Sequence, residues 1–269
     1  VAGALVPTLL AAIGWPAALV VVAAVTAAVA LPIEPLRRRG GERERGAAQT
    51  QPAVPPELAR GALRRAIAGL GAPIRLVLAE PPMRELAAVS FSYATVQLGL
   101  FTYLVSFLNL EIGYTLVAAG LVFAVAQAAG IVGRILWGAL ADRLLGARVM
   151  LGLLGITMSA CGLAAAAAGP AWPLAAVAAM SALFGASAVG WNGVYLAEVA
   201  RRAPAGAVGA ATGGTQFFTF LGALAGPPLF GLVAAATGRY AWGYAAFSAL
   251  PAAMGAWLLL VRRAAPART

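Results

Sequence analysis

Six polar side chains lie inside long apolar stretches of the sequence, at spacings that suit the binding of a small solute. In a bilayer a polar side chain is costly, so it faces the interior of a helix bundle or a water-filled cavity. Amide and phenol groups there can hydrogen-bond a solute, although amides also join neighbouring helices and a tyrosine also packs. We therefore predict a substrate site formed by Tyr93, Gln97, Gln127, Arg134, Asn192 and Gln216.

Arg134 is the one charged residue well inside an apolar stretch. It follows Gln127 by two helical turns, so the two side chains share one face of a helix. A guanidinium matches the two oxygens of a carboxylate, which indicates an anionic solute. The alternative is that Arg134 forms a structural pair or extends its side chain to water at the inner membrane surface.

The residue types needed for catalysis and metal binding are scarce. The sequence has no histidine and one cysteine, Cys161. This removes Ser–His and Cys–His nucleophiles, an internal disulfide and the most common zinc ligand. No Asp or Glu lies deep in an apolar stretch, so paired carboxylates are missing as well. We expect a protein that is not an enzyme and has no metal site and no cofactor.

These residues must be positioned by membrane helices. Hydrophobic residues make up 62% of the 269 residues and charged residues 10%, whereas a soluble domain has about 45–50% and about 25%. Backbone groups in lipid must be hydrogen-bonded internally, and apolar runs of about 20 residues without alternation predict helices. The seven runs are Trp15–Ile33, Leu86–Leu108, Thr115–Trp137, Val149–Gly169, Trp172–Ala197, Val208–Ala236 and Trp242–Val261.

Polarity is distributed unevenly over these runs. Four of the last six carry a polar face, whereas Val149–Gly169 and Trp242–Val261 carry little polarity. Glycines spaced three or four residues apart predict close contacts between helices. The pairs are Gly130 with Gly133, Gly209 with Gly213, and Gly222 with Gly226.

The arginines, which supply all 19 basic residues, decide the orientation of the helices. Ten lie in Glu34–Glu85, and of the links on the opposite side only one holds an arginine, Arg239. The positive-inside rule therefore places Glu34–Glu85 and the C-terminus in the cytoplasm.

The arginines do not gather in one patch, so the net charge of +10 does not indicate nucleic-acid binding. Exclusive use of Arg and a high Ala content favour a GC-rich genome and a bacterial inner membrane.

The segment Glu34–Glu85 divides into two parts. Arg37–Pro56 is charged and holds Gly, Pro and Gln, which predicts disorder. Glu57–Leu70 has apolar residues at helical spacing beside arginines. This predicts an amphipathic helix, either on the anionic membrane surface or packed on the cytoplasmic face of the bundle. Because Val1–Ala12 has the character of a helix tail, we expect a chain truncated at its N-terminus.

The link Gly138–Arg148 has the composition of a latch at the cytoplasmic surface. Gly138 would let two helices approach closely, and Asp142 could accept hydrogen bonds from a neighbouring helix N-terminus. Arg143 and Arg148 would hold the link at anionic headgroups. We predict a contact that closes the cytoplasmic side in one state and releases it in another. The alternative is an anchor that fixes the topology without switching.

This link resembles the loop signature of the major facilitator superfamily, G-x-L-a-D-R-x-G followed by basic residues. Here two residues separate Asp142-Arg143 from Gly146, where the family pattern has one, and a single Arg148 follows. Gly226-Pro227-Pro228 is similar to the Gly/Pro element of the family's fifth and eleventh helices. The resemblance implies an all-α membrane protein of two six-helix halves, with a substrate site near the midplane.

On this resemblance the chain would cover the end of helix five through helix twelve. Residues 1–33 would end the N-terminal half, 34–85 would form the central cytoplasmic loop, 86–262 the C-terminal six-helix bundle, and 263–269 a cytoplasmic tail. The four helices with a polar face would be helices seven, eight, ten and eleven, which line the central cavity in the family. The two helices of low polarity would be nine and twelve, which face lipid.

The resemblance implies a secondary active transporter that works by alternating access and has a small-molecule substrate and the lipid bilayer as partners. A small organic anion is the leading substrate, because of Arg134 and the amides around it. Efflux of apolar or amphiphilic compounds is the alternative. A non-transporting receptor or scaffold is less favoured, since it needs no polar faces on four helices. If a proton is the coupling ion, its carrier lies in the missing half or does not exist.

Overall fold

The computed structural model describes residues 20, 24, 69 and 71–261. The chain divides into two units, Val1–Gly71 and Ala72–Thr269, and nearly all described residues belong to the second. Several expected features therefore lie outside the described residues, apart from single positions. They are the helix tail Val1–Ala12, the span Trp15–Ile33, the disordered part Arg37–Pro56, the amphipathic helix Glu57–Leu70 and the tail 263–269.

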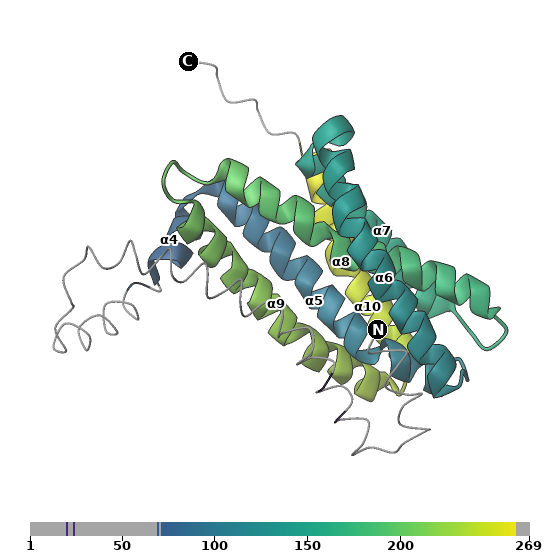
Figure 1. Ribbon diagram of the computed structural model, residues 1–269. Helices are drawn as coiled ribbons and strands as arrows, with labels where there is room; N and C mark the ends of the chain where they lie inside the picture. The colour runs from purple at the N-terminus through teal and green to yellow at the C-terminus, as the bar shows by residue number, and fades with distance from the viewer. Residues whose placement is uncertain (1–19, 21–23, 25–68, 70, 262–269) are drawn as a thin grey trace. The chain divides into compact units, whose positions relative to one another are not determined.

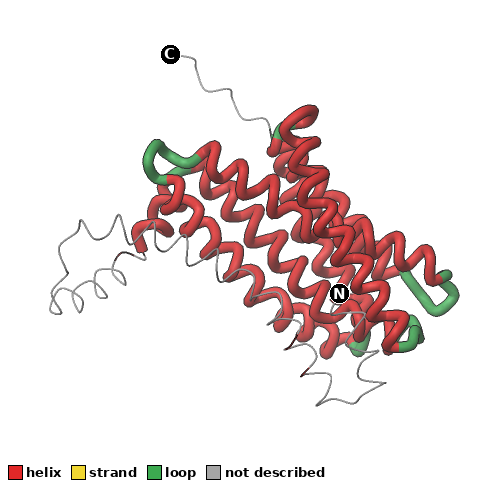
Figure 2. The backbone as a smooth tube through the Cα atoms, viewed as in Figure 1, coloured by secondary structure: helices red, strands yellow, loops and turns green. Residues whose placement is uncertain are grey.

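Between residues 71 and 261 the chain is helical apart from short links, and this part contains no strand. Figure 2 shows the long helices side by side along a common direction, with the links at their ends. Their bounds are α4 (Gly71–Ala79), α5 (Pro81–Leu110), α6 (Leu116–Leu140), the π-helical turn η1 (Ala141–Leu145), α7 (Ala147–Ala167), α8 (Leu174–Arg202), α9 (Val208–Thr237) and α10 (Tyr240–Leu260) (Figure 1).

Six of the described helices are long and apolar enough to cross a membrane. They confirm the six spans predicted between Leu86 and Val261, and the ends of the α-helices differ from the predicted ends by at most five residues. An all-α membrane bundle is therefore the fold of this part of the chain.

The start of α5 differs from the prediction. The segment assigned to a loop, Glu34–Glu85, ends in helix, because α4 covers Gly71–Ala79 and α5 begins at Pro81. Glu80 precedes α5 in an extended conformation, and two prolines occupy its first turn. Proline suits the first turn because the backbone N–H that it lacks has no partner there. The predicted span began at Leu86 and lacked this turn, because Arg84 and Glu85 interrupt the hydrophobic pattern.

The six long helices associate mainly in three pairs, α6 with α8, α5 with α9, and α7 with α10. Glycines allow backbone contact within these pairs. A Cβ added to Gly185 of α8 would lie 1.9 Å from the carbonyl oxygen of Ala126 on α6. A Cβ added to Gly226 of α9 would lie 2.2 Å from the carbonyl oxygen of Thr95 on α5. Small residues at helix contacts are how membrane helices gain van der Waals packing.

The predicted glycine contacts are confirmed for Gly130 and Gly133 on α6 and for Gly222 and Gly226 on α9, which all face a neighbouring helix closely. The prediction is wrong for Gly209 and Gly213. A Cβ at either position would meet no atom of the described residues, because both lie on a side of α9 that is exposed within this part of the chain. Gly138 likewise has no atom of the described residues within 4 Å of its Cβ position, so the close approach expected there stays a prediction.

At the end of the unit opposite Glu85, Glu111 caps α10. Its carboxylate accepts hydrogen bonds from the backbone N–H groups of Tyr240 and, at 3.3 Å, of Ala241. A negative charge is favourable there because the N-terminus of a helix carries partial positive charge. Glu111 therefore ties the end of α5 to the start of α10.

Replacement of Gly185 by alanine tests the contact between α6 and α8. The added methyl group has no room against the Ala126 carbonyl, so we expect Gly185→Ala to lower the free energy of unfolding by about 2 kcal/mol. Gly138→Ala, on α6 with open space around it, is the matched control and should leave stability unchanged. Thermal unfolding of the detergent-solubilised protein measures both. Equal stability of the two variants would contradict the close contact.

Candidate functional site

Trp191 on α8 contacts Gln97 and Tyr93 of α5 and Tyr195 of α8. It is fully buried, and its Nε1 donates a hydrogen bond to Oε1 of Gln97 on α5 at 3.1 Å. The ring of Tyr195, one turn further along α8, lies 5.2 Å from the Trp191 ring. Gln97, predicted as a substrate ligand, is thus half-buried and joined to α8, with its amide nitrogen left to donate.

Tyr93 has a packing role in this unit. Its side chain is fully buried, its hydroxyl donates to the carbonyl oxygen of Leu151 on α7 at 2.7 Å, and its ring meets the Trp191 ring edge-on at 5.7 Å. Of the two interpretations open for Tyr93, this geometry favours packing.

Gln216 on α9 belongs to a small group of polar residues that reaches α8. Its Oε1 accepts a hydrogen bond from the hydroxyl of Thr219 at 3.1 Å. The Thr219 hydroxyl lies 3.5 Å from that of Tyr195. Thr215 and Thr219 also donate to carbonyl oxygens of their own helix. The structure therefore joins Gln216 to Gln97 through Thr219, Tyr195 and Trp191.

Arg134 and Asn192 meet at one carbonyl oxygen. Nε of Arg134 on α6 donates to the Val189 oxygen of α8 at 3.3 Å, and Nδ2 of Asn192 lies 3.5 Å from the same oxygen. The terminal nitrogens of Arg134 bond to no other described residue, and the side chain is exposed on the surface of the unit. The guanidinium is therefore held at Nε while its two-nitrogen edge stays open.

Gln127 carries a polar atom that lacks a partner. Its Oε1 is buried and accepts no hydrogen bond from residues 71–261, and the same holds for the hydroxyl of Ser181 on α8. A buried acceptor without a donor costs about 1–3 kcal/mol. A water molecule or a solute with an N–H or O–H group would satisfy Gln127, which lies two turns from Arg134 on the same face of α6.

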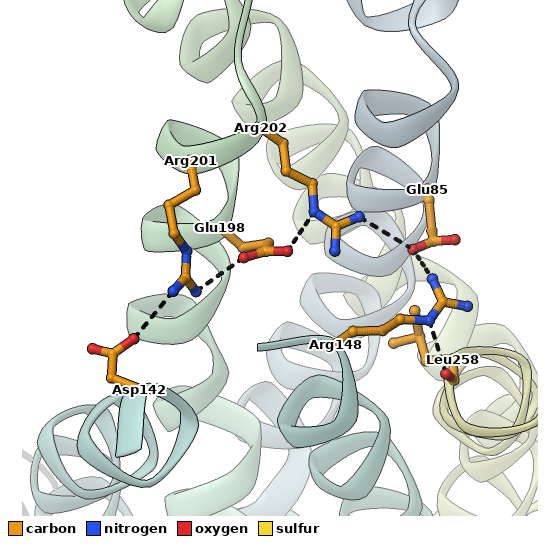
Figure 3. A network of polar contacts seen from close by, with 7 residues as sticks. All are labelled: Glu85, Asp142, Arg148, Glu198, Arg201, Arg202 and Leu258. Carbon is orange, nitrogen blue, oxygen red and sulfur yellow. Dashed lines mark hydrogen bonds and ion pairs between the residues drawn. The ribbon is translucent and has the colours of Figure 1, made fainter. Parts of the chain in front are cut away.

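A chain of charged side chains connects four elements at the arginine-rich end of the unit, which we define by Glu85, Asp142, Arg148, Glu198, Arg201 and Arg202 (Figure 3). Arg201 lies 3.3 Å from Asp142 of η1 and 2.9 Å from Glu198 of α8. Glu198 also pairs with Arg202, and Arg202 lies 3.9 Å from Glu85 of α5. Glu85 in turn pairs with Arg148 of α7.

Arg148 also binds the end of α10. Its Nε donates to the carbonyl oxygen of Leu258 at 3.1 Å, and a terminal nitrogen donates to that of Val261 at 2.9 Å. Carbonyl groups of the last helical turn have no partner within the helix, so a guanidinium there is stabilising. The expectation that Arg148 points to lipid headgroups is therefore wrong, because its bonds are directed into the unit.

The other latch residues also differ in part from the predictions. Asp142 faces Arg201 at the C-terminal end of α8, not a helix N-terminus. Arg143 is exposed and forms no ion pair within the described part of the chain, which agrees with an anchor at the membrane surface. The additional residue before Gly146 is accommodated by the π-helical turn, in which the Gly146 N–H donates to the Ala141 oxygen at 2.8 Å.

Residue spacing indicates the ion pairs of Glu198 within α8, but it does not indicate the pair of Glu85 with Arg148. Glu198 precedes Arg201 and Arg202 by three and four residues on one helix, a spacing that favours the local ion pairs observed. Glu85 was missed as a network member. Its partner Arg148 is 63 residues away, a distance over which helical spacing says nothing.

The family model described as Major Facilitator Superfamily matches residues 1–227. No curated protein matches the sequence.

Neutralising Glu85 tests whether the charge network stabilises the unit. Glu85→Gln leaves Arg148 and Arg202, both partly buried, without their shared carboxylate. We expect the free energy of unfolding to fall by about 2 kcal/mol, less than for a fully buried pair. Glu80→Gln, which removes an exposed carboxylate that makes no capping bond, should have no effect. Thermal unfolding in detergent is the measurement, and identical behaviour of the two variants would show that the network does not contribute.

Proposed function

The chain belongs to the Major Facilitator Superfamily and is a multi-pass membrane transporter, and we propose that it carries a small organic anion by alternating access. In such proteins substrate sites lie near the bilayer midplane between two halves that move against each other. The described unit would supply one wall of that site. Four of its helices, α5, α6, α8 and α9, would present polar groups to the substrate.

The hydrogen bonding of the Arg134 guanidinium is the observation that supports an anionic substrate. Its Nε is occupied by the Val189 carbonyl, whereas its terminal nitrogens have no partner among the described residues. Arginine binds a carboxylate through two parallel hydrogen bonds, and holding one nitrogen on α8 reduces the rotational freedom that binding would cost. A carboxylate of the substrate would occupy the open edge.

Amide groups would bind the remainder of the substrate. Asn192 lies beside Arg134 at the Val189 carbonyl, and Gln127 offers a buried oxygen that lacks a donor. The amide nitrogen of Gln97 forms no hydrogen bond with the described residues. Gln216 lies beside the threonine hydroxyl groups of α9 and accepts a hydrogen bond from Thr219. A substrate with a carboxylate at one end and a hydroxyl or amino group at the other would satisfy both Arg134 and Gln127.

We place the arginine-rich end in the cytoplasm of a bacterial cell, with the protein in the inner membrane. Arginines at this end outnumber those at the opposite end, where Arg239 precedes α10. The positive-inside rule supports this orientation.

The contact between Asp142 and Arg201 would form the switchable part of the latch. Asp142 has 62% of its side chain exposed and touches Arg201 at 3.3 Å, so this contact can break at small cost. By contrast, Glu85, Arg148, Arg202 and Glu198 are less exposed, and Glu85 connects α5 to both α7 and α8. These four residues would keep the unit rigid while Asp142 exchanges partners between states.

Uptake of small carboxylates by the full-length transporter in vesicles tests the proposed substrate. Arg134→Gln should raise KM at least about ten-fold, because a charge-assisted hydrogen bond contributes about 1.5–3 kcal/mol. Arg134→Lys should be intermediate, since lysine keeps the charge but lacks the two-nitrogen edge. Arg239→Gln, at the opposite end, is the control. Unchanged carboxylate uptake in Arg134→Gln would exclude the anion proposal, and export of apolar dyes without carboxylate uptake would favour the efflux alternative.

Asp142→Asn tests the latch. An exposed ion pair contributes about 0.2–1 kcal/mol, so its loss should change the balance between states and lower the transport rate by up to about five-fold. Stability and substrate affinity should stay as in the unchanged protein, in contrast to Glu85→Gln. Undiminished uptake by an Asp142→Asn variant that inserts normally would leave only the anchoring role.

A further inference from the structure

A cavity of about 420 Å³ opens at the arginine-rich end between the start of α5 and the end of α10. Neither the candidate substrate residues nor the latch residues line it. From α5 it is lined by Arg84, Glu85 and Ala88, and from α10 by Met254, Trp257 and Val261. Among the described lining residues, the charged ones come from α5 and those from α10 are apolar.

Trp257 makes the cavity suitable for a lipid chain. Trp257 is 52% exposed and belongs to α10, an apolar helix long enough to cross a membrane. Tryptophan is enriched where the hydrocarbon core meets the headgroups, because its ring is apolar and its N–H is polar. Trp257 lies in the last turn of α10, close to where such a boundary would be. An acyl chain could pack against it and against Met254.

Among the described residues that line the cavity, Arg84 is a cation without an ion-pair partner. Glu85 is paired with Arg148 and with Arg202, so its negative charge is already balanced. The last carbonyl groups of α10 are occupied by the same Arg148, as Figure 3 shows for Leu258. Arg84 is exposed and forms no ion pair or side-chain hydrogen bond among residues 71–261. Glu80 is exposed one turn earlier and does not line the cavity.

We propose that this cavity binds an anionic phospholipid from the leaflet at the arginine-rich end. The phosphate would pair with the Arg84 guanidinium, and an acyl chain would lie along Trp257 and Met254. A soluble anion could use Arg84 but would gain nothing from the apolar walls, and a neutral lipid could use the walls but would gain little from the cation. Lys and Arg near an anionic membrane surface attract acidic lipids.

Quenching of tryptophan fluorescence by brominated lipids tests this proposal on the full-length protein in vesicles. The contribution of Trp257 is the difference between the unchanged protein and Trp257→Phe. We expect brominated phosphatidylglycerol to occupy the site with about a five-fold preference over brominated phosphatidylcholine. Arg84→Gln should abolish the preference and Arg84→Lys should keep most of it. Arg239→Gln, a matched loss of charge at the opposite end, should not change it.

Three results would overturn the proposal. The first is equal quenching of Trp257 by the two lipids, and the second is a preference that persists in Arg84→Gln. The third is loss of the preference on addition of inorganic phosphate, which would assign the site to a soluble anion. None of these outcomes depends on transport, so the lipid site and the proposed substrate can fail separately.

Discussion

The close contact between α6 and α8 determines the geometry of the candidate anion site. Gly185 lets the backbone of α8 touch that of α6 at Ala126, and further along the same pair Trp137 of α6 donates from Nε1 to the Ala186 oxygen at 2.7 Å. Arg134 reaches the Val189 oxygen only because the two helices are this close. In lipid no hydrophobic force holds helices together, so packing and hydrogen bonds between them set their separation. A bulkier residue at this contact would therefore displace the guanidinium as well as loosen the pair.

The charged side chains at the arginine-rich end hold helix ends together, whereas Arg134 is the candidate substrate ligand. Arg148 occupies the carbonyl groups at the end of α10 and pairs with Glu85 at the start of α5, so a single guanidinium satisfies a helix terminus and a partly buried carboxylate. This arrangement fixes helix ends that would otherwise expose unpaired polar groups at the membrane boundary. It also leaves Arg84 and Asp142, which lie at the margins of the network, available for contacts with other molecules or states.

The sequence predicted the helices better than the contacts between them. Long apolar runs leave helix as the structure that pairs all backbone groups in lipid, so the six spans followed directly. The pair of Glu198 with Arg201 and Arg202 was also accessible, since it depends on spacing within one helix. Tyr93 and Arg148 could not be assigned in this way. Their partners Leu151 and Glu85 lie 58 and 63 residues away, and only the tertiary arrangement of the bundle, in which both α5 and α7 pack against α8 and α10, brings them together.

The helices of low polarity, α7 and α10, contribute to the site although they offer it no ligand. Tyr93 of α5 donates to the Leu151 oxygen of α7, and Tyr244 of α10 donates to the Leu100 oxygen of α5 at 3.4 Å. These bonds hold α5 from the side, at positions that flank Gln97 along the chain. A side chain is well placed for binding when residues around it fix its position. The expectation that such helices only face lipid is therefore too narrow, because α7 and α10 support the helix that presents Gln97 to Trp191.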